Sequence, residues 1–256
     1  MSVPDELSSK KQAWSREDLK GNPHGIDDKP SRVKSMFTSI ARTYDFNNHL
    51  HSLWLDQMWR HRAVKIANIT RDDDVLDVAC GTGDLAMAFQ RGGAKSVLGI
   101  DFTLAMLDIA VMKANKTQLP IEYRQGDAMN LQLEDQSFDV VSIAFGIRNV
   151  QNPSKAIAEF HRVLKPAGRL VVLEFSTPLN PLIRTFNNLY TKRIMPITAS
   201  LIARDRSGAY DYLPKSVDTF AEPKELAELI TKEGFKDVEQ HSQTFGICTI
   251  TKAVKS

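Results

Sequence analysis

The stretch VLDVACGTGD, residues 75–84, decides the fold. It begins with a short, mostly apolar run, which is typical of a strand buried on both faces of a parallel sheet. Gly81 and Gly83 then allow a sharp turn in which the backbone can approach a ligand closely. The helix expected after the turn offers free amide groups to that ligand. The pattern therefore predicts a strand, a glycine turn and a helix that together form a binding site.

On both sides of this turn, short apolar runs alternate with helical stretches. We expect strands at 75–78, 96–100, 121–124, 138–144 and 169–175, with helices that begin near Asp84, Thr103 and Ser154. A helix at 223–233 and an antiparallel pair at 237–240 and 247–252 follow. Such alternation implies parallel strands joined by crossover helices. The predicted fold is α/β and Rossmann-like.

Composition narrows the class of protein. The 256 residues include 33 basic and 31 acidic ones, so the net charge gives no case for a nucleic-acid partner. Cys80 and Cys248 are too few for a disulfide framework, and no metal-ligand cluster is visible, so we predict no metal. The N-terminus shows neither a signal peptide nor a membrane span. We expect a cytoplasmic protein, with peripheral contact at the inner membrane face as an open alternative.

The glycine turn alone does not identify its ligand. Residues 81–86 also satisfy the dinucleotide pattern, and Asp101 stands where a ribose-binding acid belongs. However, a carboxylate at Asp77 would repel a pyrophosphate. The cationic end of S-adenosylmethionine suits Asp77, with Asp84 nearby, while Asp101 accepts the ribose hydroxyls. We therefore predict S-adenosylmethionine as the cofactor and keep a nicotinamide-dependent reductase as the alternative.

A second acidic site supports this cofactor. Asp127 follows the third strand and can accept the adenine amino group, while Ala128 supplies a backbone amide. A short-chain reductase would need a tyrosine four residues before a lysine, and none of the five tyrosines has that partner. The cofactor-binding residues expected from these patterns are Asp77, Gly81, Gly83, Asp101, Asp127 and Ala128, to which the resemblance described next adds Thr82.

Several longer segments resemble the menaquinone and ubiquinone C-methyltransferases, a family of class I S-adenosylmethionine-dependent methyltransferases. They are residues 37–48, 75–84, 145–150, 162–166, 173–176 and 212–216, and the resemblance covers roughly 31–250. It implies a mostly parallel seven-stranded sheet with helices on both faces. It also implies that Thr82, Asp101, Asp127 and Ala128 contact the cofactor. The family methylates a ring carbon of a polyprenylated quinol.

The resemblance leaves the quinol open. Ala144 stands where many members of the ubiquinone branch have a serine, and the tail at 244–247 also differs. We therefore favour demethylmenaquinol as the acceptor, to give menaquinol. A polyprenyl benzoquinol of the ubiquinone branch, a soluble small molecule and a non-catalytic assembly role remain alternatives. The sequence does not indicate the oligomeric state.

A mechanism follows as a hypothesis. Carbon attacks a sulfonium methyl more readily when a quinol hydroxyl has lost its proton. Arg148 beside the ring oxygen would stabilise that negative charge, while Asn149 and Tyr44 orient the ring or a water. The proton would leave through that water to Asp45, His49 or His51, which we do not rank. The expected catalytic residues are Arg148, Asn149, Tyr44 and Asp45.

The chain divides into five expected segments. They are a mobile N-terminal tail at 1–30, N-terminal helices over the active site at 31–70, a cofactor-binding Rossmann-like core at 71–175, an insertion facing substrate or membrane at 176–213, and a C-terminal helix and strands completing the sheet at 214–256. The insertion is apolar and carries Arg184, Lys192, Arg193, Arg204 and Arg206. We expect it to shape the substrate pocket, as a lid or as a contact with anionic lipid.

Overall fold

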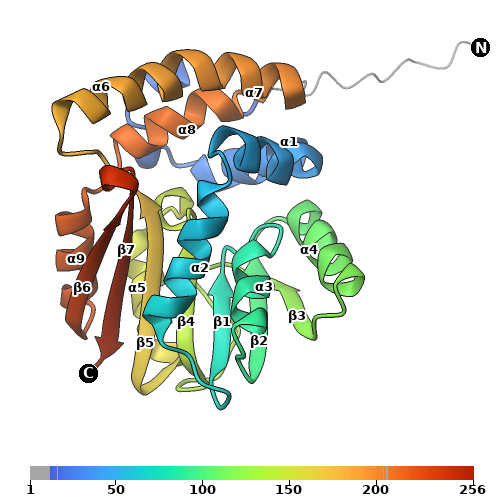
Figure 1. Cartoon of the computed structure of the whole chain (residues 1–256), viewed down its shortest axis with the longest axis vertical. Helices are drawn as coiled ribbons and strands as arrows, with labels where there is room; N and C mark the ends of the chain where they lie inside the picture. The colour runs from blue at the N-terminus through green and yellow to red at the C-terminus, as the bar shows by residue number, and fades with distance from the viewer. Residues whose placement is uncertain (1–11, 16, 204, 206) are drawn as a thin grey trace, which may run out of the picture.

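A seven-stranded sheet forms the centre of the molecule, in the order β3-β2-β1-β4-β5-β7-β6 (Figure 1). The structure is a computed structural model that describes residues 12–15, 17–203, 205 and 207–256. Its strands are β1 (Asp74–Val78), β2 (Ser96–Asp101), β3 (Ile121–Gln125), β4 (Phe138–Ala144), β5 (Leu164–Phe175), β6 (Phe235–Gln243) and β7 (Cys248–Lys255). Only β7 runs antiparallel, against both β5 and β6. The predicted mostly parallel sheet is confirmed.

Helices cover both faces of the sheet, and each face has its own apolar core. The helices are α2 (Leu55–Ala67), α3 (Asp84–Arg91), α4 (Leu104–Lys116), α5 (Pro153–Val163) and α9 (Pro223–Lys232). On one face Trp59 of α2 and Phe89 of α3 pack near Val75. On the other, Phe160 of α5 packs with Leu76. Neighbouring residues of β1 thus bury their side chains on opposite faces, as the alternation of a strand requires.

A third layer lies beyond the carboxyl ends of the parallel strands (Figure 1). It consists of α1 (Lys29–His51), α6 (Pro181–Leu189), the π-helical turn η4 (Tyr190–Ile194), α7 (Met195–Ala203) and α8 (Ala209–Asp218). Met36 and Ile40 of α1 pack there with Met195 of α7 and Tyr212 of α8. Within the described ranges, no helix combines the length and the apolar character needed to cross a bilayer.

The start of the described chain differs from the predicted mobile tail at 1–30. The Trp14 side chain is completely buried and stacks on the ring of Tyr212, with ring centroids 4.5 Å apart. Short 3-10 turns follow as η1 (Asp18–Lys20) and η2 (Pro23–Gly25). Burial of an indole outweighs the polar composition around it. The tail prediction is wrong for these residues, and its remainder, 1–11 and 16, lies outside the described residues.

Two predicted boundaries also shift. The predicted break between 213 and 214 falls inside α8, which continues through Pro214 because Tyr210, Tyr212 and Ser216 of the same helix are buried. Strand β5 begins at Leu164, which pairs with Phe138, and the next pair is Val140 with Arg169. Residues 165–168, which precede the predicted start of this strand at 169, therefore form a bulge at its beginning.

Candidate functional site

The glycine turn joins β1 to α3 at the edge where the parallel strands end. Gly81 and Gly83 both have a positive φ, of 56° and 84°. A Cβ at Gly83 would lie 2.3 Å from the Tyr123 hydroxyl, so a side chain there is excluded by space as well as by backbone conformation. The turn folds as predicted because only glycine satisfies both demands.

The turn is fixed to the next strand by Asp101, the last residue of β2. Its carboxylate accepts hydrogen bonds from the backbone amides of Gly81 and Thr103, each at 2.8 Å. Burial raises the pKa of Asp101, and these amides counteract part of that effect. The side chain is therefore held in one orientation before any ligand arrives.

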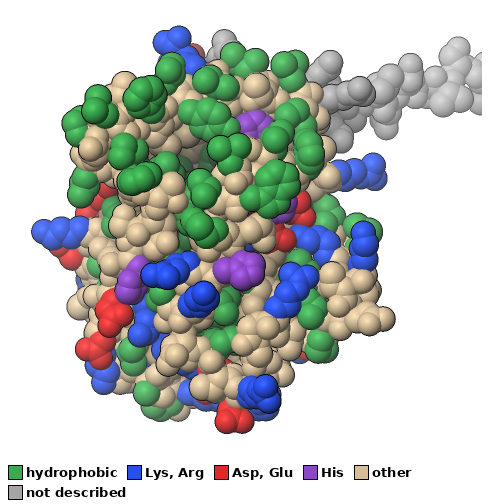
Figure 2. All heavy atoms as spheres, in the orientation of Figure 1, with side chains coloured by type: hydrophobic (Ala, Val, Ile, Leu, Met, Phe, Trp, Pro, Cys, Tyr) green, Lys and Arg blue, Asp and Glu red, His purple; other side chains and the backbone are tan. Residues whose placement is uncertain are grey.

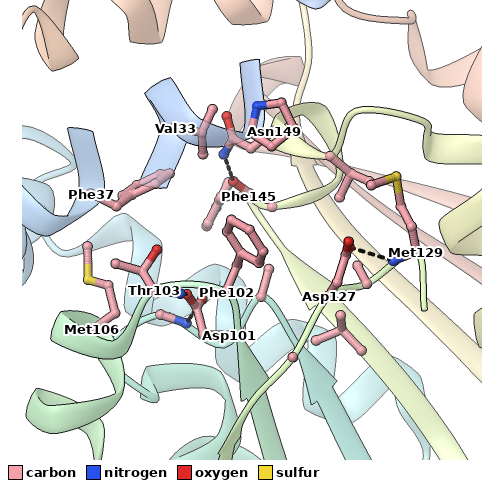
Figure 3. A pocket seen from close by; sticks show the side chains of 18 of the residues that line it. Val33, Phe37, Asp101, Phe102, Thr103, Met106, Asp127, Met129, Phe145 and Asn149 are labelled. Carbon is pink, nitrogen blue, oxygen red and sulfur yellow. Dashed lines mark hydrogen bonds between the residues drawn. The ribbon is translucent and has the colours of Figure 1, made fainter. Parts of the chain in front are cut away.

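A pocket lies beside this carboxylate, roofed by α1 (Figure 3). Its empty space is about 830 Å³, including the open mouth. Gly81, Asp101, Asp127 and Ala128 line it, and Asp127 accepts a hydrogen bond from the Met129 amide at 2.9 Å. The pocket thus brings together four of the seven residues predicted to bind the cofactor.

Asp77 lies deeper, with 1% of its surface exposed. One carboxylate oxygen accepts a hydrogen bond from the hydroxyl of Ser142, its register partner on β4, at 2.8 Å. The other oxygen, Oδ2, has no hydrogen-bond partner among the described residues. Burial raises the pKa of Asp77 to about 7. An orphaned carboxylate oxygen next to the glycine turn fits a ligand with a cationic end.

Thr82 and Asp45 face each other outside the pocket lining. The Thr82 hydroxyl donates to Asp45 at 2.5 Å, and the Lys113 ammonium pairs with Asp45 at 2.6 Å and with Asp84 at 2.5 Å. His49 lies in the same cluster and is near enough to Asp45 and Asp84 for a metal site. The lysine already supplies a cation there. In this arrangement Asp45 anchors α1 to the glycine turn.

The opposite end of the pocket is mostly apolar. Val33, Phe37 and Tyr44 of α1 line it together with Asn149 of η3 (Ile147–Asn149). The Asn149 amide donates to the Phe145 carbonyl at 3.2 Å and accepts from the Tyr212 hydroxyl at 3.0 Å. Burial raises the pKa of Tyr44, so this phenol keeps its proton at neutral pH. Tyr44 and Asn149, two of the predicted catalytic residues, therefore both line this end of the pocket.

Arg148 occupies a different place from the one expected beside a ring oxygen. Its side chain is buried and does not line the pocket. The guanidinium pairs with Glu174 at 2.6 Å and donates to the Phe145 carbonyl at 2.7 Å. The geometry corrects the predicted catalytic placement, because these partners direct the charge toward the protein interior. The sequence showed the Arg148–Asn149 pair without showing which of the two faces the pocket.

Lys29 was not anticipated. Its ammonium is buried and donates to the carbonyls of Arg148 at 2.9 Å and Val150 at 2.7 Å, on either side of Asn149. Burial, with the nearby charge of Arg148, lowers the pKa of Lys29 to about 8. A lysine beside Pro30 in a polar stretch gives no sequence signal of this role.

The bases considered from sequence also lie outside the pocket lining. His49 is bonded to Asp56 at 2.9 Å, and that hydrogen bond raises the pKa of the imidazole. His51 contacts the Asn47 carbonyl and the Thr198 hydroxyl, each at 2.8 Å. No described residue of the insertion at 176–213 lines the pocket either. Its expected role in shaping the pocket is limited to the Tyr212 contact with Asn149.

Comparisons with known proteins agree with this geometry. A sequence profile of the ubiE/COQ5 methyltransferase family matches residues 26–255. The chain is 42% identical over 221 residues to the demethylmenaquinone methyltransferase of Deinococcus radiodurans, which covers 86% of this chain and 91% of that one. It is 39% identical over 239 residues to the ubiquinone/menaquinone biosynthesis C-methyltransferase UbiE of Geobacter sulfurreducens. That match covers 91% of this chain and 92% of the relative.

Solved structures match the fold at lower identity. A SAM-dependent methyltransferase from Thermotoga maritima superposes with a TM-score of 0.59 at 20% identity, covering 86% of this chain and 100% of that one. Phosphoethanolamine N-methyltransferase 2 of Haemonchus contortus, in complex with S-adenosyl-L-methionine, superposes with a TM-score of 0.58 at 17% identity. The match covers 77% of this chain and 52% of that one. The class I methyltransferase fold is confirmed. Because the family profile matches residues 26–255, the chain belongs to the ubiE/COQ5 methyltransferase family.

Proposed function

We propose that this chain transfers a methyl group from S-adenosylmethionine to a ring carbon of demethylmenaquinol, giving menaquinol. Membership of the family makes it an S-adenosylmethionine-dependent C-methyltransferase. The observation that supports the acceptor is the contrast within the pocket, where an acidic end at Asp101 and Asp127 adjoins an apolar end at Val33 and Phe37. Two relatives with demethylmenaquinone in their names, from Deinococcus radiodurans and Thermus thermophilus, are 42% and 41% identical to the chain.

In the proposed arrangement, the cofactor lies across the ends of the strands. Asp127 and Ala128 contact the adenine, and Asp101 accepts the ribose hydroxyls. Gly81, which lines the pocket, lets the backbone approach the rest of the cofactor without a side chain in the way. The methyl group then points toward Tyr44 and the apolar end, where an aromatic ring fits between α1 and η3.

The transfer is a substitution at the methyl carbon. A quinol hydroxyl loses its proton, the ring carbon forms a bond to the methyl group, and the carbon–sulfur bond breaks to leave S-adenosylhomocysteine. The methylated ring carbon then loses its proton to water, which restores the aromatic ring, and the ring oxygen takes up a proton to give the quinol. One proton is released in total. We assign Asn149 and Tyr44 to orienting the ring oxygen, because both line the pocket and Tyr212 fixes the Asn149 amide. Holding the two carbons in line supplies much of the acceleration.

The acceptor is tested by incubating the protein with methyl-labelled S-adenosylmethionine and, in parallel, demethylmenaquinol and the demethylated ubiquinol precursor. We expect label in the naphthoquinol. Label in the benzoquinol alone would move the chain to the ubiquinone branch. Label in neither, with S-adenosylhomocysteine still bound, would remove the quinol assignment and leave the cofactor site standing.

We also propose that the third layer contacts an anionic membrane surface, from which a quinol with a long isoprenoid tail must be taken. The layer carries several apolar side chains that are mostly exposed. The exposed fractions are 90% for Leu179, 70% for Leu182 and 72% for Phe186, and on α7 they are 64% for Ile197 and 73% for Leu201. Figure 2 shows hydrophobic side chains gathered over this end of the molecule. Monomeric soluble proteins rarely expose apolar patches of such extent.

The charge of this segment favours anionic lipid as the occupant. Residues 176–203 contain Arg184, Lys192 and Arg193 and no acidic residue. Basic side chains at the rim of an apolar helical face are typical of interfacial helices. Arg204 and Arg206, also noted in the sequence, lie outside the described residues.

Co-sedimentation with phosphatidylglycerol vesicles tests this contact. The double variant Leu182→Ser/Phe186→Ser should lose most binding, and high salt should weaken binding by the unmodified chain. Met112→Ser, which replaces a side chain 61% exposed on α4, is the matched control and should bind normally. Equal binding by all three proteins would contradict the contact, as would binding confined to phosphatidylcholine vesicles.

A further inference from the structure

Lys29 is a buried cation that no carboxylate of the described residues neutralises. Only 1% of the residue is exposed. Its three N–H donors are all engaged, by the carbonyls of Arg148 at 2.9 Å and Val150 at 2.7 Å and by Nδ1 of His24 at 3.2 Å. These acceptors are uncharged at neutral pH, because burial lowers the pKa of His24. The hydrogen bonds of the ammonium are therefore satisfied, while its charge has no counterion.

A second cation lies beside Lys29, and it has a counterion of its own. Arg148 pairs with the buried Glu174 carboxylate at 2.6 Å. Burial, and then the charge of Arg148, lower the pKa of Lys29 to about 8. Two cations and one carboxylate leave one positive charge in excess behind η3. Because an unpaired charge in the interior costs free energy, we look for its counterpart in the adjoining pocket.

One peptide unit separates Lys29 from that pocket. Val150 and Gln151 line the pocket, whereas Lys29 does not. The Val150 carbonyl points to Lys29, and since the peptide bond is trans, the N–H of Gln151 points the opposite way. That amide donates to no described residue, unlike the Val150 amide, which donates to the Ile147 carbonyl at 3.2 Å. The peptide thus has a cation at its carbonyl and a free donor at its other end.

This free donor belongs to the acceptor end of the pocket. Asn149, which is assigned to the ring oxygen, lies two residues before Gln151, and Figure 3 shows it with Val33 at this end. The Gln151 side chain donates to the Ile26 carbonyl at 3.3 Å, which ties the loop to the segment before α1. Negative charge develops on the ring oxygen when the quinol hydroxyl loses its proton. An aligned peptide dipole with a cation behind it stabilises such an oxyanion.

We propose that Lys29 is a positioning residue for methyl transfer, which fixes the peptide between Val150 and Gln151 so that the Gln151 amide donates to the ring oxygen. Its charge favours the quinolate over the quinol. Lys29 keeps its own proton, and the quinol hydroxyl gives its proton to water. The inference rests on the proposed quinol acceptor, because it assigns a group that receives the charge formed on that acceptor.

Binding of a stable quinolate mimic tests this role without turnover. The probe is 2-hydroxy-1,4-naphthoquinone, an anion at neutral pH, and its uncharged counterpart is the methyl ether, both titrated with S-adenosylhomocysteine present. Lys29→Met and Lys29→Gln should each weaken the anion by about tenfold and leave the ether unchanged. Lys116→Met, which removes an exposed charge at the end of α4, is the matched control and should change neither affinity. Equal weakening of both probes, or of neither, would overturn the proposal.

The pH dependence of turnover separates the charge of Lys29 from a packing role. Lys29→Gln keeps an amide donor for the carbonyls and removes the charge, so kcat with demethylmenaquinol should fall on the order of tenfold below about pH 8. The deficit should narrow at higher pH, because Lys29 of the unmodified chain then loses its proton. Of its charged or titratable neighbours, His24 of η2 is already neutral there, and the Arg148 guanidinium keeps its proton. A deficit that does not change with pH would assign Lys29 a purely structural role.

These results are distinguishable from a failure of the proposed function. If the unmodified chain methylates demethylmenaquinol and Lys29→Gln does so at the same rate at every pH, the acceptor assignment stands and the role of Lys29 is wrong. If neither quinol is methylated but both Lys29 variants still lose affinity for the anion and not for the ether, the acceptor assignment is wrong and the anion site at η3 stands.

Discussion

The two ends of the pocket are built in different ways. At the cofactor end, Asp101 and Asp127 follow neighbouring strands, and backbone amides within a few residues hold Asp101 through Thr103 and Asp127 through Met129. At the acceptor end, Phe37 comes from α1, and Asn149 is held by α8 and flanked by carbonyls bound to Lys29. At the cofactor end these hydrogen bonds join residues two positions apart in the sequence. At the acceptor end they join segments that are more than a hundred residues apart.

Because the two ends are built differently, a residue change should act differently at each. A residue change at the cofactor end should alter ligand affinity directly, because the sheet keeps the other contacts in place. A change behind the acceptor end should act through packing, because distant side chains also hold η3, namely Tyr212 at Asn149 and Lys29 at the Arg148 and Val150 carbonyls. The four predictions below separate these cases, in order of decreasing expected effect.

Arg148→Ala should lower the free energy of unfolding by about 3–5 kcal/mol, because it leaves the buried Glu174 carboxylate without its partner. Denaturant titration measures this loss, and the exposed Arg62→Ala serves as the control. The variant Arg148→Met/Glu174→Gln should recover part of the stability. If Arg148→Ala instead lowered kcat and left the free energy of unfolding unchanged, the catalytic role predicted from the sequence would be supported.

Asp101→Ala should weaken S-adenosylhomocysteine binding by about 30-fold to 1,000-fold, the effect of losing two charged hydrogen bonds to ribose. Calorimetry checks the affinity, and Asp108→Ala, at an exposed position of α4, is the matched control. The loss of an acceptor for the Gly81 amide contributes to the effect. A change of less than threefold would place the ribose elsewhere.

Asp77→Asn should flatten the pH dependence of stability. The pKa of Asp77 is about 7 in the folded chain against 3.8 for a free aspartate, so the folded state binds more protons between about pH 4 and 7. Stability from this group is therefore present below pH 4 and is lost as the pH rises through 7, with a slope of at most about 1.4 kcal/mol per pH unit. Urea titrations across this range should show the slope in the unmodified chain and in Asp72→Asn, but not in Asp77→Asn.

Tyr212→Phe should lower kcat by about threefold to tenfold and leave S-adenosylhomocysteine affinity unchanged. The substitution removes one hydrogen bond, worth about 1 kcal/mol, that fixes the Asn149 amide at 3.0 Å. Steady-state kinetics with demethylmenaquinol measure the change. Tyr190→Phe removes a hydroxyl that contacts the His51 carbonyl outside the pocket, and its kcat should not move.

Much of the cofactor end was predictable from the sequence. An apolar strand, Gly81, Gly83 and acids at regular intervals after the strands place a ligand because parallel strands end at one edge. Four of the predicted residues line the pocket. Thr82 and Gly83 do not, because the Thr82 hydroxyl turns to Asp45 and Gly83 provides room for Tyr123.

The acceptor end was predictable only in part. The segment 145–150 was found by resemblance, but the direction of each side chain was not. Arg148 was therefore placed beside a ring oxygen, whereas its guanidinium pairs with Glu174 and does not line the pocket. Trp14 was placed in a tail because its neighbours are polar, while its burial depends on Tyr212 almost two hundred residues away.

In the proposed function, the pocket directs the methyl group to a ring carbon. The most direct test is carbon-13 NMR of the product formed from demethylmenaquinol and S-adenosylmethionine labelled in its methyl group. We predict a resonance in the range of a methyl group on an aromatic carbon. A resonance in the methoxy range would show transfer to oxygen and would contradict the proposed position of the ring between Tyr44 and Asn149.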